Sequence, residues 1–159
     1  MIRSKDPLER AREYAFLLLK FRLRSENELY LRLKDKKFAE DVIKKTIAFL
    51  RDKEFINDNV FTKTWISSRI KRKLGLRRIR EELRLKGVDR GLIDTAVLEV
   101  KKDYSENKII RDIAEERLSK LNGIEPYQAK QKVYAYLLRR GFTPETVLDV
   151  LGQLCSRAN

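Results

Sequence analysis

Histidine is absent from the 159 residues, and cysteine occurs once, as Cys155. Histidine is the commonest general base and the commonest metal ligand in proteins, so its absence argues against most acid–base and metal chemistry. A single cysteine permits no internal disulfide, which fits a reducing compartment, and it leaves ordinary structural zinc sites short of ligands. The sequence therefore predicts no catalytic residues, no cofactor and no metal site.

Long apolar runs are missing as well. The longest, Ala15 to Leu19, falls far short of the ~18 residues that a membrane-spanning helix needs, and charged residues flank it closely. We therefore expect a cytoplasmic protein without a membrane partner. The chain contains only 6 Gly and 3 Pro, and no alternating strand pattern is visible. These features predict an all-α fold with short connections.

An internal repeat organises the apolar residues. Each copy has two apolar residues one helical turn apart, a basic or glycine-containing break, a lone apolar residue and then another helix. The pattern returns 50 and 104 positions after its first appearance. The matching sets are Leu29, Leu33, Phe38, Val42, Ile43 and Ile47; Ile79, Leu83, Val88, Leu92, Ile93 and Val97; and Val133, Leu137, Phe142, Thr146, Val147 and Leu151.

A leading helix precedes the pattern in each copy, so we predict three tandem three-helix repeats, similar to helix-turn-helix domains, with about nine helices in total. Their predicted ranges are 1–54, 55–104 and 105–159. A three-helix unit of this size buries its own apolar face poorly, whereas stacked neighbours share a core. We therefore expect an elongated array that can curve.

Several residues mark helix starts. Asp6, Asp89 and Thr143 are placed to act as N-caps, and Pro7 and Pro144 suit the first helical position. Such caps satisfy backbone N–H groups that the first turn of a helix leaves without partners. Helices are therefore expected to begin at these points.

Other residues form a capping box or mark helix ends. Ser25 and Glu28 have the spacing of a capping box, in which each side chain binds the backbone of the other. Gly87 and Gly141 lie just past predicted helix ends, where a left-handed conformation is easiest for glycine. Lys37 occupies the same position in the first repeat, and a left-handed lysine there would cost on the order of 1 kcal/mol.

Positive charge is concentrated in the middle of a chain whose formal net charge is +13. A surplus of this size favours a polyanionic partner, either nucleic acid or an acidic protein surface. Only Glu81 and Glu82 oppose the basic residues between positions 69 and 86. Those basic residues, the main candidate site, are Arg69, Lys71, Arg72, Lys73, Arg77, Arg78, Arg80, Arg84 and Lys86. A second, smaller candidate cluster comprises Lys130, Lys132, Arg139 and Arg140.

Helical spacing predicts an arginine row within the main cluster. Arg77, Arg80 and Arg84 each follow a residue of the apolar stripe by one position, so they share one side of a helix over ~10 Å. Guanidinium groups in a row suit phosphates and carboxylates. The alternative is a solvated helix face whose long side chains cover apolar edges. Trp65 and Phe61 allow base stacking, but core packing is the preferred interpretation.

Three stretches resemble the RecX family of recombinase modulators. They are KEFINDNVFTKTWISSR at residues 53–69, GLRRIREELRLKGV at residues 75–88 and LLRRGF at residues 137–142. The resemblance covers roughly residues 8–154, with the internal repeat in phase. Two positions depart from the family pattern: Lys37 stands where the family often has glycine, and Thr62 follows Phe61 where a small apolar residue is common.

The resemblance implies tandem three-helix units and a specific partner. RecX-like proteins bind the RecA recombinase, mainly as its filament on single-stranded DNA, and lie in the filament groove. They limit filament growth, ATP hydrolysis and strand exchange. By this resemblance we expect a monomeric regulator, mainly an inhibitor, whose partners are the RecA filament and single-stranded DNA, with double-stranded DNA as a further option.

The sequence allows two alternative functions, direct DNA binding and catalysis. A helix-turn-helix protein that binds DNA directly would suit the charge, but the predicted third helices, at residues 40–53, 90–102 and 144–154, are dominated by apolar and mixed residues. That composition favours contact along the DNA backbone, with weak sequence preference. An enzyme is not expected, because neighbouring glutamates such as Glu81 and Glu82 point about 100° apart on a helix and do not converge.

Overall fold

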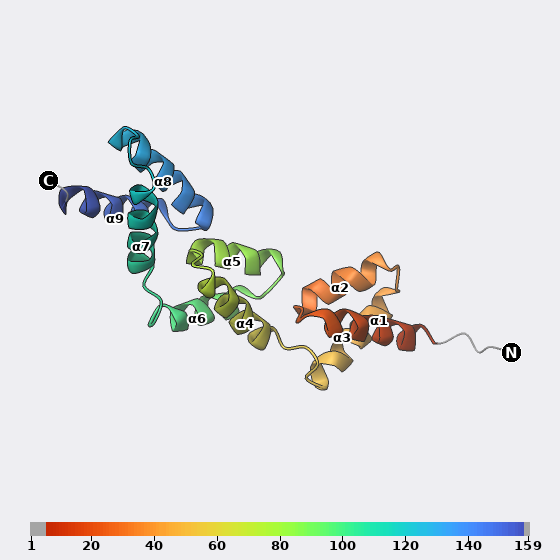
Figure 1. The fold of residues 1–159 in the computed structure, drawn as a ribbon. Helices are drawn as coiled ribbons and strands as arrows, with labels where there is room; N and C mark the ends of the chain where they lie inside the picture. Colours follow the sequence, from red (N-terminus) through yellow and green to blue (C-terminus); the bar gives the residue numbers. More distant parts are fainter. Residues whose placement is uncertain (1–5, 158–159) are drawn as a thin grey trace. The chain divides into compact units, whose positions relative to one another are not determined.

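The computed structural model describes residues 6–157, and its regular structure in that range consists of helices alone (Figure 1). The helices are α1 Pro7–Phe21, α2 Glu26–Asp35, α3 Glu40–Asp52, α4 Asp58–Lys71, α5 Leu76–Leu85, α6 Arg90–Val100, α7 Glu106–Ser119, α8 Pro126–Arg140 and α9 Pro144–Arg157. The predicted all-α fold of nine helices is thus confirmed for the described residues.

Most of the predicted helix starts are confirmed. The capping box at α2 is complete, with Glu28 N–H donating to Ser25 Oγ and Ser25 N–H donating to the Glu28 carboxylate. Asp89 accepts from Leu92 N–H, and Thr143 accepts from Thr146 N–H. A cap of this kind stabilises a helix by about 1 kcal/mol.

The predicted cap at α1 is wrong in one respect. Asp6 is the N-cap residue and Pro7 does occupy the first turn, but the Asp6 side chain accepts no backbone hydrogen bond. Asp6 is exposed. Water can therefore satisfy the first amides of α1, and the helix does not depend on a side-chain cap.

The three repeats share one way of ending their second helix. Lys37, Gly87 and Gly141 are all left-handed, with φ of 64°, 71° and 95°. In each case the next residue donates its N–H to a carbonyl five positions earlier: Phe38 to Leu33, Val88 to Leu83 and Phe142 to Leu137. This is the hydrogen-bond pattern of a Schellman motif, which glycine accommodates without steric cost. The first repeat forms it with Lys37, which bears the steric cost of the left-handed conformation.

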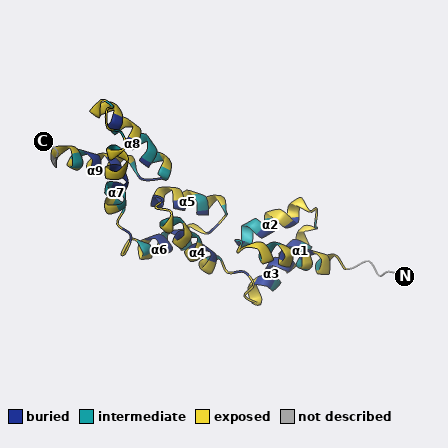
Figure 2. Ribbon diagram, in the orientation of Figure 1, coloured by how far each residue is buried: buried dark blue, intermediate teal, exposed yellow. Residues whose placement is uncertain are grey.

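The repeated apolar positions form the core. The paired residues of the second helices are all fully buried: Leu29, Leu33, Ile79, Leu83, Val133 and Leu137. Figure 2 shows buried, intermediate and exposed residues along each helix. The equivalent pair in each third helix is buried too: Ile43 and Ile47, Ile93 and Val97, and Val147 and Leu151. Helices α1, α2 and α3 pack against one another, as do α7, α8 and α9. The offsets of 50 and 104 positions therefore correspond to equivalent places in the fold.

The described chain forms two compact units. The first runs to Trp65 and adds Leu83–Ile93, while the second contains Ile66–Glu82 and the described residues from Asp94 onward. Residues of α4, α5 and α6 therefore belong to both units. The repeat boundaries at 54 and 104 and the elongated array stay predictions. Between residues 6 and 157 no helix is both long and apolar enough to cross a membrane.

Replacing Lys37 by glycine should stabilise the protein. Glycine removes the left-handed strain of the lysine, which is about 1–2 kcal/mol. The larger conformational entropy of glycine in the unfolded chain offsets roughly 0.5–1 kcal/mol of that gain. The expected gain is therefore roughly 0.5–1 kcal/mol, measured by urea unfolding. The matched control is Lys45→Gly in the interior of α3, which should cost about 1 kcal/mol. A decrease in stability of Lys37→Gly would contradict the assigned backbone conformation.

Candidate partner and nucleic-acid interface

Cations gather at the turn between α4 and α5. Lys71 ends α4, Arg72 and Lys73 form the turn, and all three are exposed. Lys73 is left-handed, with φ of 54°, and its N–H donates to the Ile70 carbonyl at 2.8 Å. Within the described chain, the side chains of Lys71 and Arg72 form no hydrogen bond or ion pair. These two charges are therefore available to a partner.

The C-terminal end of α8 docks on the start of α5. Arg77 Nη2 donates to the Leu138 carbonyl at 3.0 Å, and Arg78 Nη1 donates to the Arg139 carbonyl at 3.2 Å. Gly75 N–H donates to the Arg140 carbonyl at 2.9 Å. The last carbonyls of a helix lack intrahelical donors and carry partial negative charge, so cations there are favourable. Arg77 and Arg78 thus cap α8.

Arg140 makes the reverse contact. Its guanidinium donates to the Arg72 carbonyl and, at 3.3 Å, to the Lys73 carbonyl. Glycines allow the backbones to come this close. A Cβ on Gly75 would lie 2.2 Å from the Gly141 carbonyl carbon, and a Cβ on Gly141 would lie 2.1 Å from Arg78 Cβ. No other residue type fits at either position without a shift of the backbone.

Two residues at the junction of the second and third repeats complete this contact, which we call the α5–α8 joint. Glu106, the first residue of α7, accepts from Leu76 N–H at 2.8 Å, and the Tyr104 hydroxyl donates to the Leu74 carbonyl at 2.9 Å. Burial, with a contribution from the Glu106 charge, raises the pKa of Tyr104 to about 12. The hydroxyl therefore stays protonated and keeps donating at any physiological pH.

The first unit contains an equivalent α2–α5 joint. Asp58, the first residue of α4, accepts from Glu26 N–H at 2.9 Å, just as Glu106 accepts from Leu76 N–H. Ser25 Oγ donates to the Lys86 carbonyl at 2.6 Å. A Cβ on Gly87 would lie 2.4 Å from the Asn27 side chain. The internal repeat therefore extends from the apolar pattern to the polar contacts between successive repeats.

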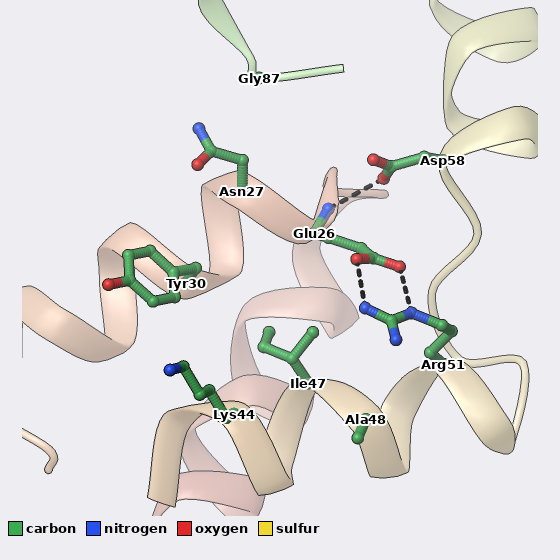
Figure 3. Close-up of a pocket in the computed structure, with 9 residues that line it drawn as sticks. All are labelled: Glu26, Asn27, Tyr30, Lys44, Ile47, Ala48, Arg51, Asp58 and Gly87. Carbon is green, nitrogen blue, oxygen red and sulfur yellow. Dashed lines mark hydrogen bonds and ion pairs between the residues drawn. The ribbon is translucent and has the colours of Figure 1, made fainter. Parts of the chain in front are cut away.

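A hollow of about 480 Å³ lies beside the α2–α5 joint (Figure 3). In Figure 3 the Asp58 carboxylate faces the Glu26 backbone N–H, while the Glu26 carboxylate pairs with Arg51 through two contacts of 2.7 Å. Burial raises the pKa of Asp58, and the hydrogen bond from Glu26 N–H opposes that effect. Both carboxylates thus have structural partners at the α2–α5 joint.

The main predicted cluster is divided among several structural tasks. Arg69 and Arg78 both pair with Glu82, at 2.6 and 3.0 Å, and Arg80 pairs with Asp94. In the first unit, Lys86 pairs with Glu28 at 2.8 Å. The three arginines of the predicted row therefore have three different environments. Arg77 caps α8, Arg80 is in an ion pair, and Arg84 is exposed near the end of α5.

The second predicted cluster separates into two parts. Arg139 and Arg140 lie at the α5–α8 joint, close to the turn that holds Lys71, Arg72 and Lys73. Lys132 instead lines a hollow of about 160 Å³ with Arg117 and Lys120, and Lys130 is half-buried on α8. We call the set at the joint the basic joint surface. It comprises Lys71, Arg72, Lys73, Arg77, Arg78, Arg139 and Arg140.

Sequence reasoning missed Arg117 and Lys120, which are distant from both clusters along the chain. The Arg117 guanidinium lies 3.6 Å from the centre of the Tyr136 ring, and Lys120 pairs with Glu116 at 2.6 Å. That hydrogen bond lowers the pKa of Glu116, and Lys73 contributes in the same direction. The spacing of Glu116 and Lys120 predicts their pairing, but nothing local places Lys132 beside them.

The aromatic pair of α4 is largely structural. Phe61 is buried, as expected for core packing, and its ring stacks on Trp65 with centroids 5.8 Å apart. Trp65 is half-buried, and the Lys86 ammonium lies 4.3 Å from the centre of its ring. A cation over the indole face stabilises the side chain in this position.

Three family models match the chain in order. The first, second and third three-helix domains of RecX match residues 11–50, 57–97 and 105–151. Regulatory protein RecX from Mannheimia succiniciproducens is 34% identical over 140 residues, which are 87% of this chain and 90% of that protein. Regulatory protein RecX from Haemophilus influenzae is 31% identical over 141 residues, 88% of this chain and 91% of that protein.

Solved structures share the fold. The crystal structure of RecX from Lactobacillus salivarius superposes with a TM-score of 0.81 at 20% identity, covering 95% of this chain and 98% of that one. A second crystal structure, of a regulatory protein RecX, has a TM-score of 0.77 at 21% identity and covers 93% of this chain. The arrangement of the helices therefore recurs in distant sequences.

Glu28 should make the stability of the α2–α5 joint depend on pH. Burial would raise its pKa, but hydrogen bonds from Arg22, Lys86 and the Ser25 backbone outweigh burial and lower the pKa from 4.5 to about 2. Because the folded pKa is the lower one, the stabilisation is present above pH 4.5 and is lost as pH falls toward 2.

Replacing Glu28 by glutamine should remove this stabilisation, on the order of 1–3 kcal/mol near neutral pH. The difference from the parent protein, measured by urea unfolding, should shrink as pH falls from 4.5 to about 2. Glu9→Gln, at an exposed carboxylate of α1, controls for the removal of one negative charge. A difference between parent and Glu28→Gln that stays constant across that range would refute the ion-pair assignment.

Proposed function

Because the chain belongs to the RecX family, we propose that it regulates the RecA recombinase by binding the RecA filament on single-stranded DNA. Its curated relatives are named regulatory proteins, and a regulator needs a binding surface instead of a catalytic site. In this proposal the protein acts as a monomer in the cytoplasm, lies in the filament groove and mainly inhibits filament growth, ATP hydrolysis and strand exchange.

The basic joint surface is the observation that carries this proposal. It joins exposed cations from two stretches that are more than sixty positions apart in the sequence, Lys71 to Lys73 and Arg139. Arg140 and the backbone contacts at Gly75 fix the turn that presents these cations. Charges held in place before binding lose less conformational entropy on association, so each contributes more to affinity.

A filament of recombinase on single-stranded DNA offers a regular array of anionic groups, which such a surface complements. Electrostatic complementarity mainly increases the association rate and the specificity for the partner, and it has a smaller effect on affinity. The structural contacts of Arg77, Arg78 and Arg80 assign them to holding the surface, while Lys71, Arg72, Lys73 and Arg139 provide its free charge. Inhibition would follow from occupying a surface that the filament needs for growth or exchange.

Direct DNA binding is the second candidate function. The three-helix repeats and the charge favour it, but the third helices carry few groups suited to base edges. On α6 the exposed positions include Leu98 and Glu99, and on α9 they include Glu145 and Leu148. Carboxylates and leucines facing a phosphate backbone disfavour entry into the major groove. Contact by this route would follow phosphates with weak sequence preference.

Neutralising the free charge of the basic joint surface should relieve inhibition. A variant with Lys71, Arg72, Lys73 and Arg139 all replaced by glutamine removes four cations without touching the caps of α8. The concentration needed for half-maximal inhibition of single-stranded-DNA-dependent ATP hydrolysis by RecA should rise roughly tenfold to hundredfold. Circular dichroism and urea unfolding should show the fold intact.

The matched control replaces four other exposed cations, Arg10, Arg32, Lys101 and Lys102, by glutamine and has the same net charge. It should inhibit nearly as well as the parent. Equal inhibition by both quadruple variants would refute the site. No effect of the parent protein on ATP hydrolysis at stoichiometric amounts would refute the function. Tight binding of the parent to DNA alone, without any effect on ATP hydrolysis, would favour the second candidate.

A further inference from the structure

A cluster of three phenylalanine rings lies on the first unit, outside the basic joint surface. Phe16 of α1 meets Phe55, which follows α3, edge to face with centroids 4.8 Å apart. Phe49 of α3 lies 6.5 Å from each of the other two rings. Phe55 is 50% exposed and Phe16 is 37% exposed. Aromatic rings grouped at a surface cost solvation free energy, so they suggest a binding role.

Cations flank the rings at helical spacing on both helices. On α1, Arg12 and Lys20 stand four residues before and after Phe16. On α3 and its C-cap, Lys45 and Lys53 stand four residues before and after Phe49. Residues four apart lie on the same helix face. Since α1 and α3 pack together, the two cation–ring–cation series are neighbours.

Contacts between the series confirm that they form one surface, which we call the phenylalanine platform. The Arg12 guanidinium of α1 lies 3.9 Å from the centre of the Phe49 ring of α3. In the described part of the chain, Arg12, Lys20, Lys45 and Lys53 make no side-chain ion pair or hydrogen bond. The platform comprises Phe16, Phe49 and Phe55 with Arg12, Lys20, Lys45 and Lys53.

A hollow of about 240 Å³ adjoins the platform at Phe55. Its walls include the apolar residues Leu23, Phe55 and Val60 and the polar residues Arg24, Glu54 and Asn57. Phe55 thus borders a recess of mixed character that contains one further cation and one anion. Asp52 and Glu54, next to Lys53 in the sequence, offset part of the positive charge, and the cations remain in excess.

We propose that the phenylalanine platform binds a single-stranded nucleic acid by stacking its bases on the exposed rings of Phe55 and Phe16. Arg12, Lys20, Lys45 and Lys53 contact the phosphates. A single strand alternates planar rings with anions, and this surface alternates aromatic rings with cations at each helical turn. Aromatic faces that stack bases beside a cationic track are the usual means of binding single strands. Bases paired inside a duplex could not reach these rings.

This inference goes beyond the proposed function, because it needs no recombinase and uses another repeat. The test measures binding of the whole protein to a labelled oligodeoxythymidylate and to an abasic oligomer of the same length. The parent should prefer the oligomer that carries bases. Phe55→Leu keeps an apolar side chain but removes the stacking ring, so it should weaken binding to that oligomer about tenfold and leave binding to the abasic one unchanged.

Phe21→Leu is the matched control, because Phe21 is 77% exposed at the end of α1 and lies outside the ring cluster. It should bind both oligomers as the parent does. A variant with Lys20, Lys45 and Lys53 replaced by glutamine should bind both oligomers more weakly. Its slope of log K against log salt should be shallower by about 0.7 for each phosphate that the variant no longer neutralises.

Three outcomes would overturn the platform. The first is no preference for bases in the parent, and the second is an unchanged preference for bases in Phe55→Leu. The third is a Phe55→Leu protein that binds both oligomers normally but inhibits recombinase poorly, which would assign the platform to a protein surface instead. None of these outcomes depends on the basic joint surface, whose glutamine variant should retain the preference for bases.

Discussion

Two glycines, Gly75 and Gly141, permit the contact on which the second unit depends. Without side chains there, the last carbonyls of α8 come within hydrogen-bond distance of the first turn of α5. The last carbonyls of α8 then accept hydrogen bonds from Gly75 N–H, Arg77 and Arg78. The Glu106 carboxylate accepts from Leu76 N–H. Helix ends normally leave such groups to water or to local caps. Here the end of a helix in one repeat and the start of a helix in another supply hydrogen-bond partners to each other.

The same constraint explains why the candidate interface has its composition. The backbone carbonyls at this joint accept hydrogen bonds from arginines, and the exposed cations of the α4–α5 turn lie beside them. Arg77, Arg78 and Arg140 therefore hold the structure, while Lys71 and Arg72 are left to meet a partner. Charge density along the sequence does not separate these two tasks. In the α2–α5 joint the position equivalent to Arg78 is Glu28, which pairs with the Lys86 side chain instead of with a backbone carbonyl.

Sequence reasoning succeeded where the physics is local. The apolar offsets and the capping box at Ser25 depend on residues within a turn or two of one another, and both are confirmed. It failed where partners are distant. The carbonyl at Leu138 is sixty-one positions from Arg77, and no local signal distinguishes an arginine that caps a helix from one that binds phosphate. The ring cluster around Phe55 was missed for the same reason, because it assembles from two helices and a turn.

Amide hydrogen exchange at Gly75 and Leu76 tests the α5–α8 joint most directly. Both amides belong to the start of a helix, where N–H groups usually exchange quickly because they lack intrahelical partners. Their N–H groups donate to the Arg140 carbonyl and the Glu106 carboxylate, so they should exchange slowly. Their protection factors should be well above those of the Glu40 and Asp41 amides, which begin α3 without a side-chain cap. Exchange at Gly75 and Leu76 as fast as at Glu40 and Asp41 would show that the joint is open in solution and would contradict this account.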